Sequence, residues 1–412
     1  MKFQENFSRA SKRLHLISSH DALTILQHCL YASKLNYVLR TSPCAGHPTL
    51  SYCDDLLRKA LSAVVNVQLS DDQWLQANLP VCLGGLGIRN ITMLAPSAFL
   101  SSAAATIDLQ NNILARCCVS ACSEIDRCLT LWSSLSSSDY PLGPASHKQR
   151  NWDQKVCQTV FSFLLNRQGD PVDKARLLAV SAPHSSDWLK ALPISSCGLR
   201  LSNEAVRVSV GLRLGCRLCE PHTCPCGISV DARGLHGLSC KKSSGRMSRH
   251  QCLNDIIFRA IGKAGVPAIK EPSGLWRSDG KRPDGLTHIP WSSGKCLTWD
   301  VTVTDTLAAS NLSLSSAAAG GAAENAATKK TAKYAGLADC YSFIPIALET
   351  LGPVCSEGAE LIDSIGARIR DVSGDPREKS FLWQRVSVAI QRFNAVCLLG
   401  TFEEPPQDFN CF

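Results

Sequence analysis

Hydrophobic residues recur at spacings of three and four along most of the first 215 residues. This period places apolar side chains on one face of a helix, so we expect a helical N-terminal half. The predicted helices span 12–40, 49–67, 93–135, 151–180 (one helix or two) and 200–214. The Ser-, Pro- and Gly-rich segment 137–150 predicts a linker after the third of them.

The stretch SYCDD, Ser51–Asp55, matches the tyrosine-x-Asp-Asp box in which reverse transcriptases bind their catalytic metals. That box lies in a β-hairpin, whereas DDLLRKALSAVV has the period of a helix. Acidic residues also favour a helix N-terminus, because they offset the positive end of the helix dipole. We therefore predict that Asp54 and Asp55 lie at the start of a helix and bind no metal.

Residues 297–304 alternate between apolar and polar side chains, which predicts a strand with one core face and one polar face. RPDGLTHI, from Arg282, supplies a partner strand through the turn PWSSG. An Ala- and Ser-rich helix, a buried strand at 341–352 and two more helices complete the chain. The helix between two strands indicates a β-α-β crossover. The expected fold class is α+β and multidomain, ending in a mixed sheet with flanking helices.

Asp284 and Asp300 lie symmetrically about residue 292, the centre of the predicted turn. Regular antiparallel pairing would make them cross-strand neighbours, where like charges destabilise the pair unless a cation lies between them. With the Val301 carbonyl they would form an oxygen-rich site suited to Mg²⁺. The alternative is an ordinary hairpin with solvated acids. Lys330 and Lys333 share one face of the following helix and could reach the site, or could lie on a solvated face.

Five of the 21 cysteines lie between Cys216 and Cys240. The tightest set is spaced C-x-C-x9-H-x3-C, and a tetrahedral zinc site commonly uses two such close ligand pairs. Its members are Cys224, Cys226, His236 and Cys240. Because C-x-C is shorter than the usual first pair, Cys219 is an alternative to Cys224 or Cys226. Scattered buried thiols remain the other interpretation.

The composition limits the kind of protein and partner only broadly. The 412 residues carry a net charge of +8, and 45% of them are hydrophobic, so the chain can form real cores and suits a polyanionic partner. The polar first residues contain no signal peptide, which favours an intracellular protein with reduced thiols. No apolar run approaches the roughly 20 residues of a membrane span, so no membrane partner is expected.

RPD followed by WDVTVTD resembles the PD-(D/E)xK nuclease core. More closely, four blocks in order resemble the C-terminal part of non-LTR retrotransposon proteins with a restriction-like endonuclease. They are LPVCLGGLGIRN, WLKALPISSCGLRLSNEAVRVSVGLRLG, CPCG…GLHGLSC with GRMSRHQCLNDI, and KRPDG…LTWDVTVTD…KKTAKY. The resemblance implies a reverse-transcriptase thumb-like region at 1–136, a helical connector at 151–215, a zinc knuckle at 216–243 and an endonuclease domain at 244–412.

The resemblance also implies a Mg²⁺-dependent nuclease that nicks DNA in the nucleus, with element RNA as a further partner. Asp284 and Asp300 would hold the metal, and Lys330 or Lys333 would orient water or neutralise charge. The family's usual strand lysine is Thr302 here, and the resemblance implies that its role is shifted to the K-x-x-K-Y helix ending at Tyr334. The polymerase palm is absent, which predicts a fragment or a domesticated descendant.

Basic residues after the zinc knuckle are expected to contact DNA phosphates, which fix the position of a protein on a duplex. They are Lys241, Lys242, Arg246 and Arg249. His250 follows on the same helix, where a capping or surface role is expected. The alternative to an active nuclease is a catalytically inert, zinc-containing protein that binds nucleic acid. The third possibility is a product with no affinity for nucleic acid.

Overall fold

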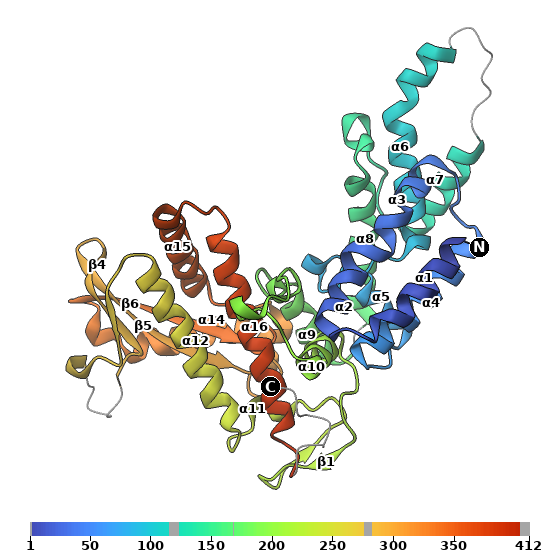
Figure 1. The fold of residues 1–412 in the computed structure, drawn as a ribbon. Coiled ribbons are helices and arrows are strands. Elements are labelled where there is room, and N and C mark those ends of the chain that lie inside the picture. Colours follow the sequence, from blue (N-terminus) through green and yellow to red (C-terminus); the bar gives the residue numbers. More distant parts are fainter. Residues whose placement is uncertain (1, 115–122, 168, 276–281, 404–412) are drawn as a thin grey trace. The chain divides into compact units, whose positions relative to one another are not determined.

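The computed structural model describes residues 2–114, 123–167, 169–275 and 282–403 (Figure 1). Contacts divide the chain into two compact units, Met1–Gly169 and Asp170–Phe412. The fold is mixed α+β, with a helical first unit and a second unit that carries the strands.

The first unit consists of helices. They are α1 Lys2–Leu14, α2 Ser19–Ile25, α3 Ala32–Thr41, α4 Pro48–Val65, α5 Asp71–Ala77, α6 Ile91–Leu114, α7 Ser123–Leu135 and α8 Gln149–Arg167. The prediction of a single helix over 12–40 is wrong. Ser18 caps a new helix by accepting the Asp21 N–H, and a π-helical turn, Leu26–Leu30, separates α2 from α3. Of the predicted helix 93–135, residues 115–122 lie outside the described residues.

Asp54 and Asp55 lie in a helix, as predicted, but not at its start. Helix α4 begins at Pro48, and Asp54 is buried in its second turn. Its carboxylate accepts N–H groups from Ile91 (2.9 Å) and Thr92 (3.0 Å). Asp54 therefore caps the N-terminus of α6, a helix that begins 37 residues later in the chain.

The predicted linker 137–150 lies inside the first unit. Trp152 of α8 packs edge-on against Trp132 of α7, with ring centroids 5.2 Å apart, and Tyr140 from the segment stacks on the same ring at 6.4 Å. This aromatic cluster joins α7, α8 and the segment between them, and α8 also packs against α6. The boundary between the compact units falls later, at 169–170. The division into four domains is finer than these two units and stays a prediction.

The second unit combines helices with two sheets. Its helices are α9 Pro171–Ser181, α10 Asn203–Leu214, α11 His236–Ser239, α12 Ser244–Lys263, α13 Leu312–Ala317, α14 Gly321–Lys333, α15 Ser356–Ser373 and α16 Glu378–Leu399. Its strands are β1 His222–Thr223, β2 Ser229–Val230, β3 Ala268–Lys270, β4 Gly285–Ser292, β5 Lys295–Thr304 and β6 Tyr341–Glu349. The strands β3-β4-β5-β6 form one sheet in that order, antiparallel except for the parallel pair β5–β6. The predicted mixed sheet and crossover are confirmed, whereas the sequence analysis missed β3.

The turn between β4 and β5 is shorter than predicted. Ser292 pairs with Lys295, and the two residues between them, Ser293 and Gly294, have φ of 50° and 75°. Two positive φ values in a two-residue loop match the twist of a hairpin. Trp291 therefore belongs to β4, and an irregularity near Pro290 shifts the register on that side.

Helices cover both faces of β5. On one face Leu297, Trp299 and Val301 belong to a hydrophobic core that includes residues of α12, α15 and α16. On the other, α14 packs against β5 and β6, and Asp300 is only 3% exposed. Of the predicted polar face, Thr298 and Asp300 are therefore buried, whereas Thr302 and Thr304 are half-buried. Figure 1 shows the sheet and the helices of this unit.

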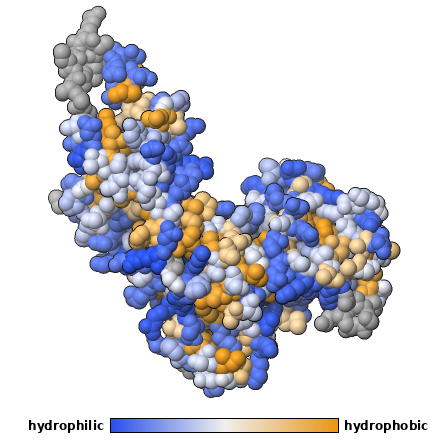
Figure 2. Space-filling view, turned by 180° about the vertical axis from the view of Figure 1, so that it is seen from behind, coloured by the Kyte–Doolittle hydropathy of each residue, from blue (hydrophilic) through white to orange (hydrophobic). Residues whose placement is uncertain are grey.

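On the face shown in Figure 2, hydrophobic side chains occur in separate patches among hydrophilic ones. Within the described part of the chain, no helix combines the length and the apolar character needed to cross a bilayer.

Candidate functional site

Asp284 and Asp300 lie side by side at one end of the β4–β5 hairpin. Gly285, the first residue of β4, pairs with Trp299. Asp284 directly precedes β4, and its N–H donates to the Trp299 carbonyl at 2.9 Å, so its carboxylate lies close enough to Asp300 to raise the pKa of that group. Asp284 Oδ2 also accepts the Val301 N–H at 2.6 Å. The register expected from the sequence holds at this end of the hairpin, because the irregular pairing is confined to the turn side.

Helix α14 supplies a cation and a hydroxyl to the buried Asp300. Lys330 donates to Asp300 Oδ1, and the Tyr334 hydroxyl lies 2.8 Å from Oδ2. Lys333 donates to that hydroxyl at 3.0 Å instead of contacting the carboxylate. The K-x-x-K-Y segment therefore reaches Asp300 directly through Lys330 and Tyr334, and indirectly through Lys333.

Helix α12 contributes two side chains that the sequence analysis did not assign to the site. His250 Nε2 lies 3.1 Å from Asp284 Oδ2, and Asn254 donates to the Asp284 carbonyl at 3.4 Å while accepting the Trp299 indole N–H at 2.9 Å. His250 lies in the second turn of α12, so it does not cap the helix, and its side chain remains 35% exposed. The one sign of these two residues in the sequence is their spacing: they are polar, lie four positions apart and flank the apolar face of the helix.

Burial dominates the electrostatics of the acidic pair. Burial raises the pKa of the Asp300 carboxyl, the charge of Asp284 raises it further, and Lys330 and Tyr334 oppose both effects. The hydrogen bond to Asp284 raises the pKa of His250. Two carboxylates in a poorly hydrated place favour a proton or a cation between them. The set of oxygen ligands suits a hard divalent ion.

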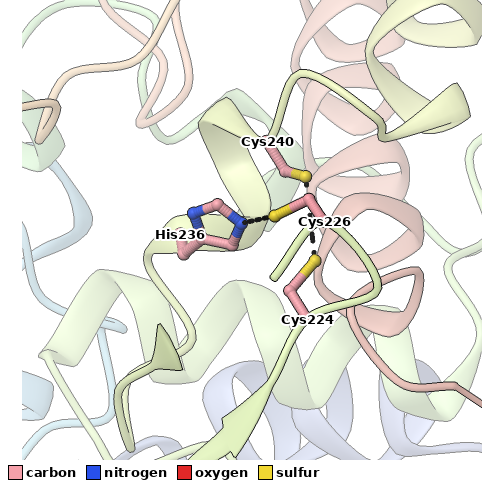
Figure 3. A group of neighbouring side chains, drawn as sticks. All are labelled: Cys224, Cys226, His236 and Cys240. Carbon is pink, nitrogen blue, oxygen red and sulfur yellow. Dashed lines mark hydrogen bonds between the residues drawn. The ribbon is translucent and has the colours of Figure 1, made fainter. Parts of the chain in front are cut away.

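The second candidate site is a group of three cysteines and one histidine. Cys224 and Cys226 flank a tight turn in which the Cys224 carbonyl accepts the Gly227 N–H, with Gly227 at φ +88°. His236 opens the short helix α11 and Cys240 directly follows it. Cys224 and Cys240 have sulfurs 3.8 Å apart, and Cys226 Sγ lies 3.1 Å from His236 Nε2 (Figure 3).

All four ligand atoms lie within 4.8 Å of one another, so this group could hold a metal ion such as zinc. Among the described residues it is the one group of three or more Cys, His, Asp or Glu side chains that meets this spacing. Cys219 is not part of it, since its sulfur lies 3.3 Å from the Asp231 carbonyl. The group that meets the ligand spacing therefore contains Cys224 and Cys226 as its first pair and leaves Cys219 outside.

The basic residues after the cluster differ in accessibility. Lys241, Lys242 and Arg246 are exposed, and Arg246 bonds the Ser239 carbonyl at 3.1 Å. Arg249 is 1% exposed and donates to Asn394 at 2.8 Å and to the Leu238 carbonyl at 3.4 Å. The predicted phosphate contact of Arg249 is wrong, because a guanidinium enclosed by α11 and α16 cannot reach a duplex.

No protein-family model matches the chain, and a search of curated proteins finds no significant match.

Proposed function

We propose that the second unit is a Mg²⁺-dependent DNA endonuclease that nicks one strand of a duplex. The observation that carries this proposal is the proximity of Asp284, directly before β4, to the buried Asp300 of β5, with Lys330 bonded to Asp300. We infer a retrotransposon origin from the order of the sequence blocks that resemble such proteins.

The acidic pair is costly for the fold unless it serves a ligand. Asp300 is buried beside a second carboxylate, and each additional negative charge in such a place costs free energy. One lysine offsets only part of that cost. A divalent ion between Asp284 and Asp300 would offset it more fully, which is why we propose Mg²⁺ at this position.

When bound, Mg²⁺ would activate a water molecule and stabilise the charge that develops on the attacked phosphate. The chain's own groups have simpler roles. Asp284 and Asp300 supply ligand oxygens, and Lys330 supplies a positive charge next to Asp300. An ammonium group held in this way stabilises developing negative charge without reorganising.

We propose zinc at the Cys-Cys-His-Cys group, because three sulfurs and one imidazole nitrogen are the ligand set of closed structural zinc sites. Lys241, Lys242 and Arg246 lie exposed beside it. They would contact DNA phosphates and position the duplex, without reading its sequence.

The alternative is a catalytically inert protein that binds nucleic acid. It is favoured by one observation, the presence of Thr302 on β5 where the resembling nucleases carry their strand lysine. In this alternative Lys330 would only neutralise Asp300.

The deciding experiment is a nicking assay on supercoiled plasmid, with Mg²⁺ and with EDTA. We expect Mg²⁺-dependent nicking by the unsubstituted chain, and a loss on the order of 10²–10³-fold in Asp300→Asn and Asp284→Asn. Asp339→Asn, which changes an exposed carboxylate, is the matched control and should retain activity. Equal nicking by all four proteins would identify a contaminating nuclease and reject the proposal.

A gel-shift titration over a range of salt concentrations separates the alternative from a protein with no affinity for DNA. Binding that weakens steeply with salt, in a chain that does not nick, would favour the inert protein, because phosphate contacts release counterions.

A further inference from the structure

Helix α12 holds the Asp284 segment at two points. His250 and Asn254 are four residues apart and so lie on one face of the helix. Asn254 bonds the backbone of Asp284, whereas His250 bonds its side chain. Both contacts join a helix of the core to the first carboxylate of the acidic pair.

The two oxygens of the Asp284 carboxylate are used differently. Oδ2 accepts the Val301 N–H at 2.6 Å and lies 3.1 Å from His250 Nε2. In the described part of the chain Oδ1 has no hydrogen-bond partner. Two donors from different elements thus fix the orientation of the carboxylate through one oxygen and leave the other available.

We propose that His250 is a positioning residue of the metal site: its Nε2–H donates to Asp284 Oδ2 and orients Oδ1 toward a divalent cation shared with Asp300. This inference rests on the proposed function, because the cation is the same one.

A role as a direct metal ligand fits the structure less well. The ligand atoms of His250, Asp284 and Asp300 do not all lie within 4.8 Å of one another, unlike those of the Cys-Cys-His-Cys group. An imidazole that donates to a ligating carboxylate fixes the ligand's orientation, and removal of such an outer partner typically lowers metal affinity by about 10–100-fold.

A role as a mere packing contact also fits poorly. The His250 side chain is 35% exposed, and it borders an open hollow of about 780 Å³ together with Gln251, Lys270 and Arg282. Solvent can therefore reach the His250 side chain from this hollow.

The test measures Mn²⁺ binding to the full chain, after zinc has been loaded at the cysteine site, by counting free Mn²⁺ with electron paramagnetic resonance. We expect the apparent dissociation constant to rise by about 10–100-fold in His250→Ala. His250→Gln should recover most of the affinity, because the Gln side-chain amide can donate from about the position of Nε2. Gln251 borders the same hollow, so Gln251→Ala is the control and should bind Mn²⁺ as tightly as the unsubstituted chain does.

Several outcomes would overturn the inference. Equal Mn²⁺ affinity in His250→Ala and the unsubstituted chain would do so, as would absence of Mn²⁺ binding by the unsubstituted chain. Loss of affinity in His250→Gln equal to that in His250→Ala would also contradict the proposed donor role.

Failure of the proposed function is recognised separately. If the unsubstituted chain binds Mn²⁺ and His250→Ala weakens that binding, but no plasmid is nicked, the endonuclease proposal fails and the positioning role stands. Thermal unfolding of His250→Ala without metal, matched to that of Gln251→Ala, shows that the fold is intact.

Discussion

At the residue scale, Asp54 shows how one side chain serves an element distant in sequence. Its carboxylate bonds the first two N–H groups of α6, the Thr92 hydroxyl at 2.5 Å and the Tyr31 hydroxyl at 2.9 Å. The neighbouring Asp55 is exposed. This segment resembles a polymerase metal box in sequence, but its two carboxylates have different structural roles. Asp54 caps a helix, whereas Asp55 is exposed.

We expect Asp54→Ala to destabilise the first unit by about 2–4 kcal/mol. Loss of a helix cap costs about 1 kcal/mol, and buried donors left without an acceptor cost about 1–3 kcal/mol more. Asp55→Ala is the matched control and should change the free energy of unfolding by less than about 0.5 kcal/mol. Chemical denaturation measures both, and equal effects would contradict the capping role of Asp54.

At the element scale, close packing of Gly285 against Trp299 fixes the part of the β4–β5 hairpin that carries the acidic pair. Gly285 opens β4 directly after Asp284, and a Cβ built on it would lie 2.0 Å from the Trp299 ring. Trp299 is fully buried and its indole N–H is bonded to Asn254. The ring therefore cannot move aside without breaking a buried hydrogen bond.

We expect Gly285→Ala to destabilise the second unit by about 1–3 kcal/mol, the usual cost of overpacking a core. It should also reduce nicking, because Asp284 is the adjacent residue. Gly274→Ala is the control, since a Cβ there meets nothing within 4 Å. Unfolding in urea checks the stability effect, and a neutral Gly285→Ala would show that the hairpin is more adaptable than its packing indicates.

At the scale of the whole molecule, the cysteine cluster is joined to the core of the second unit. Arg249 of α12 donates to the Leu238 carbonyl of α11 and to Asn394 of α16. Asn394 in turn donates to the Thr350 carbonyl at 2.7 Å, just after β6. Arg233, from the loop between the two ligand pairs, bonds Asp173 of α9 at 2.8 Å.

We therefore expect metal loss to destabilise the second unit and leave the first unchanged. The purified chain should carry about one zinc ion, retained in Cys219→Ser and lost in Cys240→Ser. Mass spectrometry measures the content, and hydrogen exchange after chelation should show lost protection within 170–403 alone. Zinc loss in Cys219→Ser would contradict the ligand set selected by the structure.

Much of the fold and part of the site could be predicted from the sequence. The helix period, the alternation over β5 and the spacing of Asp284 and Asp300 about the turn are local properties, so they predicted the helices, the hairpin and the neighbouring carboxylates. The spacing of Cys224, Cys226, His236 and Cys240 is also local, and it predicted the group of four side chains that could hold a metal ion.

What only the tertiary structure decided depends on contacts between residues far apart in the chain. The burial of Arg249 requires α16, the partner of Asp54 is α6, and the contact of His250 with Asp284 joins residues 34 apart. Local sequence patterns record which face of an element is apolar, but they do not record which element covers it. The sequence therefore determined the candidate ligands, and packing between elements decided which polar groups surround them.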